Sequence, residues 1–529
     1  MERRTTFKLA AAGLAAPALA GPALLAGDAQ AQSARDGVLR LANAVELNTL
    51  DPHAVLDTGR LNFKVNVYDS LYRFAGNPPV MQPWLAERHE VSADGIRVRV
   101  HLRRGVVFHD GSPFTAADVV YSMERMLALQ QGPTRLFAGL VAPGGTRALD
   151  DHTVEFTLTR PAAPFPSLLS EFYVVNSRLV RANERDGDWG RAWLAGNVAA
   201  SGSWRVTAYD PAVGWEGERF DGHFLPWHER APTGIRFRTI REANSQTLGM
   251  QRGDIDYFIG TLSADQVERM ARARSVVALR EPSTRLFMML FNTRRPPFDD
   301  VHVRRAISMA FDYEGWINGI MNGTATRSTG PIPPGLPGAL PAPVFNYDLD
   351  AARAELARAA VRVDRPVSLH CMTGIARTEQ AAQVMQAGLR QLGIEARIVA
   401  ETWPTLANRC RTEETTPDMM TIWSGAEYMD PHNWIGDHYH SAQHGNWKAC
   451  SWWSGPETDE MITRAYQSQD EAERIRLYGD VARRAAESAA SVYIHNEDWL
   501  GVRNTRVQGF EFTPVGNGNH IRSMWLQNS

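Results

Sequence analysis

The side chains of this chain that could do acid–base chemistry gather in two places. His109 and Asp110 are neighbours in a short loop, but no nucleophile or metal-ligand spacing accompanies them, so we expect a structural role. Glu427 and Asp430 lie three residues apart. Two carboxylates that face one cleft can hydrolyse a glycosidic bond, although paired acids are common by chance. An exported carboxylate-dependent hydrolase is therefore only the second choice of function.

A histidine cluster near the second acidic pair could instead hold a metal ion. On a strand, His438 and His440 would share one face and could bind a metal together. The segment has no recognisable zinc spacing, and no carboxylate is assured to orient the rings. We therefore predict no metal and no cofactor, and histidines that are hydrogen-bonded or exposed. The cluster consists of His432, His438, His440 and His444, together with Asp437.

Composition and motifs narrow the function further. The sequence holds no Gly-x-Ser-x-Gly, no His-Glu-x-x-His and no P-loop, so we do not expect an enzyme. The formal net charge of −3 argues against nucleic acid or a charged membrane surface as partner. Three cysteines are too few for a disulfide framework. Whether any two of Cys371, Cys410 and Cys450 pair is left open.

The N-terminus is typical of an export signal, residues 1–31. Arg3, Arg4 and Lys8 precede an apolar stretch that ends at Ala29-Gln30-Ala31, a small-x-small pattern that predicts cleavage near Ala31. The two arginines leave both the general secretory route and the twin-arginine route open. No cysteine lies near the cleavage site, so we expect no lipid anchor and a periplasmic location.

The elements that must position these residues alternate between strands and helices. Residues 96–102 alternate in polarity like a half-buried strand, and Thr115 with Asp118 forms a capping box for the next helix. Residues 286–292 form an apolar run typical of a strand buried on both faces. Asp300 can cap the helix that follows. This alternation predicts an α/β fold of two or three lobes, because 529 residues exceed one core.

Two segments carry a family resemblance. Residues 102–121, LRRGVVFHDGSPFTAADVVY, and residues 296–312, PPFDDVHVRRAISMAFD, closely resemble motifs of the extracytoplasmic solute-binding proteins of ABC transporters, family 5, which bind peptides or nickel. The resemblance implies a periplasmic-binding-protein-like fold with two lobes joined by two hinge strands and an extra subdomain in lobe one. The implied boundaries are 32–80, 198–285 and 495–529 for lobe one, 81–197 for the subdomain and 286–494 for lobe two.

The same resemblance implies a function. The chain is expected to be a monomeric periplasmic binding protein that takes up a small solute, peptide-like or other, and delivers it to the permease subunits of an ABC importer. A nickel- or haem-chelate-binding member of the same fold remains an alternative. Binding proteins of this kind close two lobes over the ligand, so we expect specificity to reside in the cleft.

The resemblance also places the ligand at the loop that follows a strand at 419–423. Peptide-binding relatives usually carry an aspartate for the peptide's amino terminus where this chain has Ala426, so we expect no simple α-amino anchor. Arg377 could hold a carboxylate as a bidentate partner, and aromatic rings of the loop could stack on the ligand. The expected ligand-binding residues are Asp57, Arg377, Trp423, Glu427, Tyr428, Asp430 and Trp434.

Overall fold

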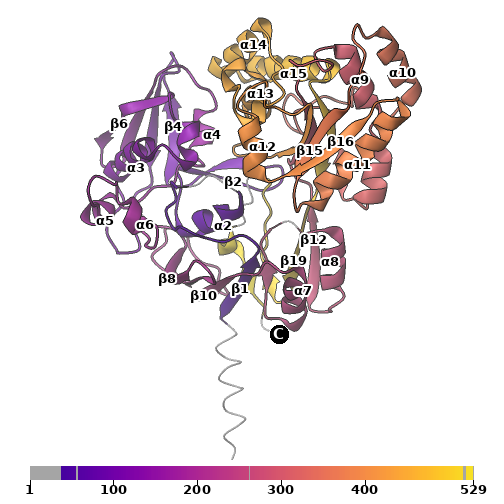
Figure 1. The fold of residues 1–529 in the computed structure, drawn as a ribbon. Helices are drawn as coiled ribbons and strands as arrows, with labels where there is room; N and C mark the ends of the chain where they lie inside the picture. The colour runs from indigo at the N-terminus through magenta and orange to yellow at the C-terminus, as the bar shows by residue number, and fades with distance from the viewer. Residues whose placement is uncertain (1–36, 55–57, 261, 516–519, 528–529) are drawn as a thin grey trace, which may run out of the picture.

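The computed structural model describes residues 37–54, 58–260, 262–515 and 520–527, which form three sheets with their helices (Figure 1). The first sheet has seven strands in the order β12-β19-β11-β1-β10-β9-β8. Its strands are β1 (Val38–Asn43), β8 (Trp204–Asp210), β9 (Gly214–Arg219), β10 (Gly234–Thr239), β11 (Tyr257–Phe258), β12 (Val276–Glu281) and β19 (Trp499–Asn504). Helices α2 (Thr58–Val67), α7 (Ala243–Arg252) and α8 (Ala264–Ala271) belong to this part of the molecule.

The second large sheet has six strands in the order β14-β18-β13-β17-β15-β16. Its strands are β13 (Leu286–Phe291), β14 (Ala325–Arg327), β15 (Val367–Met372), β16 (Ala396–Glu401), β17 (Met419–Ser424) and β18 (Ser491–Glu497). The α-helices that accompany it are α9 (Val301–Met309), α10 (Leu349–Arg358), α11 (Ala376–Gln391), α12 (Trp403–Arg409), α13 (His432–Tyr439), α14 (Pro456–Gln467) and α15 (Glu471–Glu487). Short helices η2 (Gly315–Ile320), η3 (Ser441–Gln443) and η4 (Trp447–Ala449) complete it.

A third, four-stranded antiparallel sheet stands apart from the other two, in the order β4-β5-β7-β6 (Figure 1). It consists of β4 (Ala86–Val91), β5 (Arg97–Leu102), β6 (Val141–Asp150) and β7 (Thr153–Leu158), with α3 (Ala116–Leu129), η1 (Gly132–Leu136), α4 (Phe165–Leu168), α5 (Ser177–Ala182) and α6 (Arg191–Leu194). Two further antiparallel pairs lie outside these sheets: the hairpin of β2 (Tyr72–Ala75) and β3 (Val80–Pro83), and the pair of β20 (Val507–Gln508) and β21 (Trp525–Leu526). The short helix η5 (Ile521–Ser523) also lies outside them.

The chain passes between the two large sheets twice. It goes from β12 to β13 through residues 282–285, and from β18 to β19 through Asp498. Asp498 accepts a hydrogen bond from Arg280 Nε of β12 at 2.6 Å, which ties the second crossing to the strand that leads into the first. We call the bodies around the seven-, six- and four-stranded sheets lobe one, lobe two and the subdomain. The exact residue boundaries between them stay a prediction.

Several local predictions are confirmed. Thr115 and Asp118 form the capping box of α3, and Asp300 caps α9 by accepting from the His302 amide at 2.8 Å. All six residues of β13 are buried, as expected for a central strand. His109 Nε2 lies 2.9 Å from the Gly202 carbonyl oxygen, so this imidazole joins two segments of the fold.

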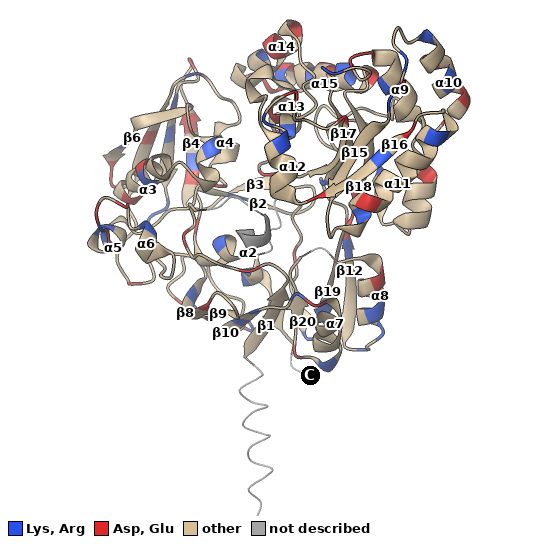
Figure 2. Ribbon diagram, viewed as in Figure 1, with Lys and Arg blue, Asp and Glu red and all other residues tan. Residues whose placement is uncertain are grey.

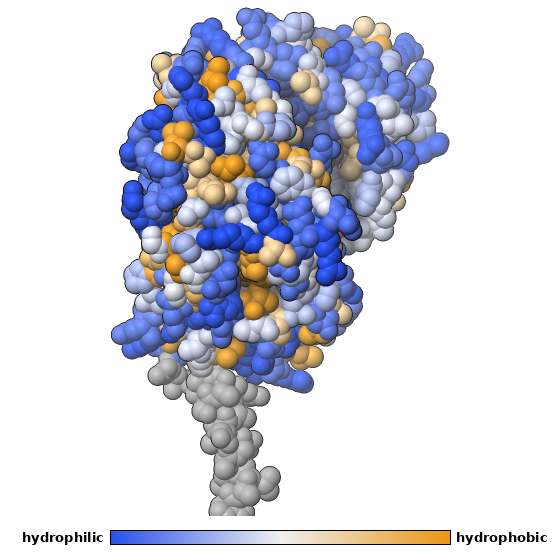
Figure 3. Space-filling model, turned by 90° about the vertical axis from the view of Figure 1, so that its left-hand side faces the viewer, coloured by the Kyte–Doolittle hydropathy of each residue, from blue (hydrophilic) through white to orange (hydrophobic). Residues whose placement is uncertain are grey.

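The surface carries charge of both signs. Lysine and arginine residues are interspersed with acidic residues in both lobes and in the subdomain (Figure 2). On the face that Figure 3 shows, hydrophobic residues occur in small groups between hydrophilic ones. None of the helices in the described part of the chain combines the length and the apolar character needed to span a bilayer.

Candidate functional site

One edge of the six-stranded sheet faces lobe one. Strand β15 runs parallel to β16 and β17, so the carboxyl ends of these three strands meet at one edge. Leu286, the first residue of β13, pairs with Ser424 at the end of β17. Because the crossing from lobe one enters at Leu286, this edge borders the space between the lobes. Open α/β sheets bind ligands at the carboxyl ends of their strands.

Trp423 lies at this edge and is half-buried. Its ring packs against Phe287 with centroids 4.7 Å apart. The guanidinium of Arg285 lies 5.0 Å from the ring centroid of Trp423, a favourable cation–π arrangement. The indole is therefore held by its neighbours from two sides.

A buried carboxylate beside Trp423 is held by two arginines. Glu497, at the end of β18, is 2.7 Å from Arg285 Nη1 and 2.6 Å from Arg377 Nη1. Burial alone would raise the pKa of Glu497, but the two guanidinium groups lower it, so the carboxylate is ionised. One negative charge between two positive charges leaves an excess of one positive charge at this edge.

The two arginines remain accessible. The side chain of Arg285 is 39% exposed and that of Arg377 is 25% exposed. Arg377 is thus already ion-paired within the protein, and its predicted contact with a ligand carboxylate stays a prediction. A second carboxylate could bind beside Glu497 because guanidinium groups offer several donors in one plane.

The acidic residues of the loop after β17 are engaged in contacts within the protein. Glu427 pairs with Arg135 of the subdomain and lies 3.1 Å from Lys448 Nζ. Burial raises the pKa of Glu427, but these two cations outweigh it and lower the value. Asp430 pairs with Arg474 of α15. Glu427 and Asp430 therefore have separate cationic partners within the protein.

The aromatic residues of the same loop are buried. Tyr428 packs into the hydrophobic core of the subdomain, although it belongs to a loop of lobe two. Trp434 packs into the core formed by α13, α14 and α15. Ala426 forms an isolated parallel β-bridge with Val515 of the C-terminal segment. Asp57, the remaining predicted contact, lies outside the described residues.

His438 and His440 do not share a strand face, because residues 432–439 form helix α13. Residues two apart on a helix point in different directions. His438 Nε2 lies 2.8 Å from Ser424 Oγ, and burial lowers the pKa of His438 to about 3. His440 Nε2 lies 3.1 Å from Thr463 Oγ1. No group of three or more histidine, cysteine or acidic side chains that could hold a metal occurs among the described residues.

Four residues at this edge were not predicted from the sequence. Arg285 directly precedes β13, and Glu497, the last residue of β18, is the carboxylate that Arg285 and Arg377 clamp beside Trp423. Ile375 and Trp403 are 42% and 38% exposed, and they follow the carboxyl ends of β15 and β16. A large apolar side chain two or three residues after an apolar strand, where ligands of open α/β sheets bind, is the sequence signal that could have identified them.

The comparison with known proteins decides the family. Residues 80–446 match the model of the bacterial extracellular solute-binding proteins, family 5, middle region. The chain belongs to this family.

Curated relatives match over nearly their whole length. The probable D,D-dipeptide-binding periplasmic protein DdpA of Escherichia coli is 28% identical, covering 90% of this chain and 92% of the relative. The dipeptide-binding protein of Escherichia coli is 25% identical, covering 88% of this chain and 89% of the relative. The resemblance found in the sequence motifs is thereby confirmed.

A solved structure shows the same fold. The periplasmic binding protein DppA of Helicobacter pylori, in complex with the peptide STSA, superimposes with a TM-score of 0.79 at 22% identity, covering 93% of this chain and 98% of that chain. The predicted periplasmic-binding-protein-like α/β fold is confirmed. The chain is a solute-binding protein of the kind that serves ABC importers.

Proposed function

We propose that this protein is exported by the signal at residues 1–31, works in the periplasm without catalysing a reaction, and delivers a small solute to the permease of an ABC importer. The solute carries a carboxylate and binds between the lobes at the edge that holds Trp423. The observation that carries the proposal is the clamp of Arg285 and Arg377 around buried Glu497. The excess positive charge favours a carboxylate there.

The loop after β17 argues against an amine as the main anchor. A buried ammonium group needs a carboxylate partner, because its desolvation is costly. Ala426 offers none, and Glu427 already pairs with Arg135 and Lys448. A peptide-like solute, which the names of the relatives suggest, would therefore be held by its carboxylate and by stacking on Trp423 rather than by its amino group.

The test uses a panel of di- and tripeptides in free, N-acetylated and C-amidated forms, measured by calorimetry. We expect N-acetylation to change affinity little and C-amidation to weaken it at least about tenfold, because a charge-assisted hydrogen bond contributes ~1.5–3 kcal/mol. Arg377→Gln should weaken binding of the free peptides similarly. Arg397→Gln, at a 71% exposed arginine of β16, is the matched control and should bind like the wild type.

Trp423→Ala gives an independent check on the same edge. We expect weaker binding by ~1–3 kcal/mol from the lost ring contact, with the fold retained by circular dichroism. Wild-type affinity in a folded Trp423→Ala variant would show that the solute binds elsewhere. Binding of free peptides that is lost on N-acetylation and in Glu427→Gln would show that Glu427 anchors the amine and that the carboxylate proposal is wrong.

A further inference from the structure

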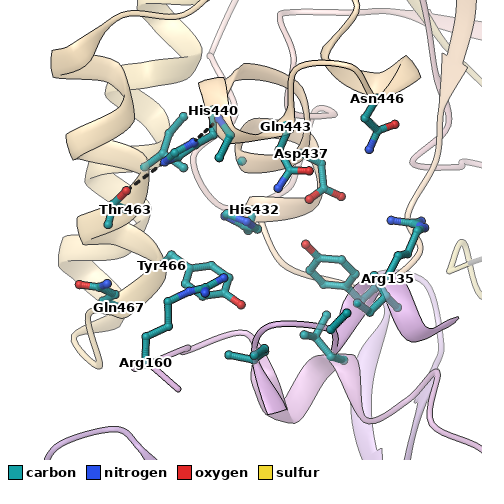
Figure 4. A pocket seen from close by; sticks show the side chains of 18 residues that line it. Arg135, Arg160, His432, Asp437, His440, Gln443, Asn446, Thr463, Tyr466 and Gln467 are labelled. Carbon is teal, nitrogen blue, oxygen red and sulfur yellow. Dashed lines mark hydrogen bonds between the residues drawn. The ribbon is translucent and has the colours of Figure 1, made fainter. Parts of the chain in front are cut away.

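A cavity of about 400 Å³ lies between the subdomain and helices α13 and α14 (Figure 4). Its wall combines η1, α4 and the residues Ala138, Leu140 and Arg160 of the subdomain with the loop after β17 and the region from α13 to α14 of lobe two. Among the described residues that line it, none belongs to the edge with Trp423, Arg285 and Arg377. The volume is within the range of known small-molecule sites.

The wall carries one positive charge without a counterion. The guanidinium of Arg160 lies 5.8 Å from the ring centroid of Tyr466 and donates one long hydrogen bond, of 3.4 Å, to the Gly139 carbonyl oxygen. No carboxylate among the described residues lies within ion-pair distance of Arg160. The other charged groups of the wall are compensated, since Arg135 pairs with Glu427 and Asp437 lies 2.8 Å from Lys448 Nζ. An anion in the cavity would therefore find its partner at Arg160.

The wall also offers hydrogen-bonding groups that the protein leaves unused. Tyr428 is only 2% exposed and lines the cavity, yet its hydroxyl has no hydrogen-bond partner among the described residues. The hydroxyl therefore stays available to a molecule in the cavity. The side-chain amide of Gln443 is also unpaired within the described part of the chain, and Asn446 uses only its oxygen, which accepts from the Lys448 amide at 3.2 Å. Figure 4 shows Gln443 and Asn446 on the side of the cavity opposite Arg160 and Tyr466.

We propose that this cavity is a second binding site, for a small hydroxylated carboxylate of the size of a sugar acid. Arg160 binds the carboxylate, while Tyr428, Gln443 and Asn446 exchange hydrogen bonds with the hydroxyl groups. Amide side chains suit hydroxyl groups because they donate and accept in one plane. The occupant touches both the subdomain and lobe two, so it stabilises the arrangement in which these two bodies are in contact. The residues that line this site differ from those of the solute site at the Trp423 edge.

The test measures the binding of glucuronate and gluconate to the mature protein by saturation-transfer NMR and calorimetry. Glucose and glucitol are the matched neutral compounds. We expect both acids to bind and the neutral compounds to bind at least about tenfold more weakly, as the loss of a charge-assisted contact predicts. Arg160→Gln should reduce acid binding at least about tenfold, and Tyr428→Phe should also reduce it. Arg97→Gln, at an exposed arginine of the same subdomain, should leave it unchanged.

Trp423→Ala separates this site from the solute site. Acid binding that persists in Trp423→Ala and is lost in Arg160→Gln supports the second site, whatever the outcome of the peptide panel. The proposal is overturned if neither acid binds at millimolar concentration, if the neutral compounds bind equally well, or if the Arg160→Gln variant binds the acids as the wild type does. Loss of binding in Trp423→Ala alone would also overturn it, because the acids would then occupy the edge of the sheet.

Discussion

The ion pair between Arg135 and Glu427 should hold the subdomain against lobe two. Arg135 belongs to η1 and Glu427 to the loop after β17, so the pair joins the two bodies. Lys448 lies 3.1 Å from Glu427 and 2.8 Å from Asp437. Glu427→Gln would therefore remove the attraction to Arg135, while Lys448 keeps Asp437 as a carboxylate partner.

The expected cost follows from the exposure of the partners. Breaking a buried ion pair costs ~3–5 kcal/mol, whereas a surface pair contributes ~0–1 kcal/mol. The side chain of Glu427 is 20% exposed and that of Arg135 is 41% exposed, so this pair lies between the two limits. We call the arrangement closed when the subdomain contacts lobe two and open when this contact is broken. We expect Glu427→Gln to destabilise the closed arrangement by about 1–2 kcal/mol relative to the open one, which makes the open one about 5–30 times more populated.

Amide hydrogen exchange measures this change without a ligand. The Ala163 amide of the subdomain donates to the Tyr466 carbonyl oxygen of α14 at 2.9 Å, and this bond breaks when the two bodies separate. In Glu427→Gln the exchange rate of Ala163 should rise by about 5–30-fold. Glu395→Gln is the control, because Glu395 is 67% exposed and pairs with Arg397 within lobe two. An unchanged Ala163 rate in Glu427→Gln, or the same rise in the control, would refute the reasoning.

Two further predictions concern stability. Cys410 and Cys450 form a disulfide that closes a loop of 40 residues. Replacing both by serine should lower the free energy of unfolding, measured by urea titration, by about 3–4 kcal/mol. An unchanged urea midpoint would show that the disulfide does not stabilise the fold. Asp418 is buried, which raises its pKa, but hydrogen bonds from Arg365, the Ser368 amide and Arg295 lower it to about 2 from 3.8. This lowered pKa stabilises the fold by about 2 kcal/mol above pH ~4, and the contribution disappears as the pH falls toward about 2. Asp418→Asn should therefore flatten the loss of stability over this acid range, and an unflattened acid limb would contradict the assignment.

The parts of the fold that depend on short-range pattern could be predicted from the sequence. The capping box at Thr115 and the cap at Asp300 involve residues no more than three apart. The uninterrupted apolar run of β13 requires burial on both faces. In each case, the residues that determine the local structure are neighbours in the chain, so their types are sufficient.

The helix at residues 432–439 was not predicted from the sequence. His438 and His440 would share a face on a strand, but α13 directs them to Ser424 and Thr463. Asp430, Pro431 and the apolar residues at Trp434 and Ile435 begin a helix after the loop. The aromatic and histidine-rich composition of the segment obscured that helical pattern.

The candidate site depends on contacts between residues far apart in the sequence. Arg285 and Glu497 are 212 residues apart, and Arg377 and Glu497 are 120 apart. Nothing in the local sequence of Glu497 indicates that two arginines will converge on it. The partner of Glu427 was equally hidden, because Arg135 lies in a different body of the fold. Long-range ion pairs follow from topology, which the local pattern does not determine.

The loop after β17 joins the proposed solute site to the contact between the subdomain and lobe two. Trp423 lies at the solute edge, and four residues later Glu427 pairs with Arg135 while Tyr428 enters the core of the subdomain. A solute that orders this loop therefore also favours the contact between the bodies. Linkage requires the converse: the apparent solute affinity is proportional to the closed fraction of the ligand-free protein, so Glu427→Gln must weaken binding by the factor by which it lowers that fraction. An affinity that falls by the factor calculated from the closed fractions, which Ala163 exchange gives, would show that closure and binding are one equilibrium, and a different factor would show that the loop moves independently of the lobes.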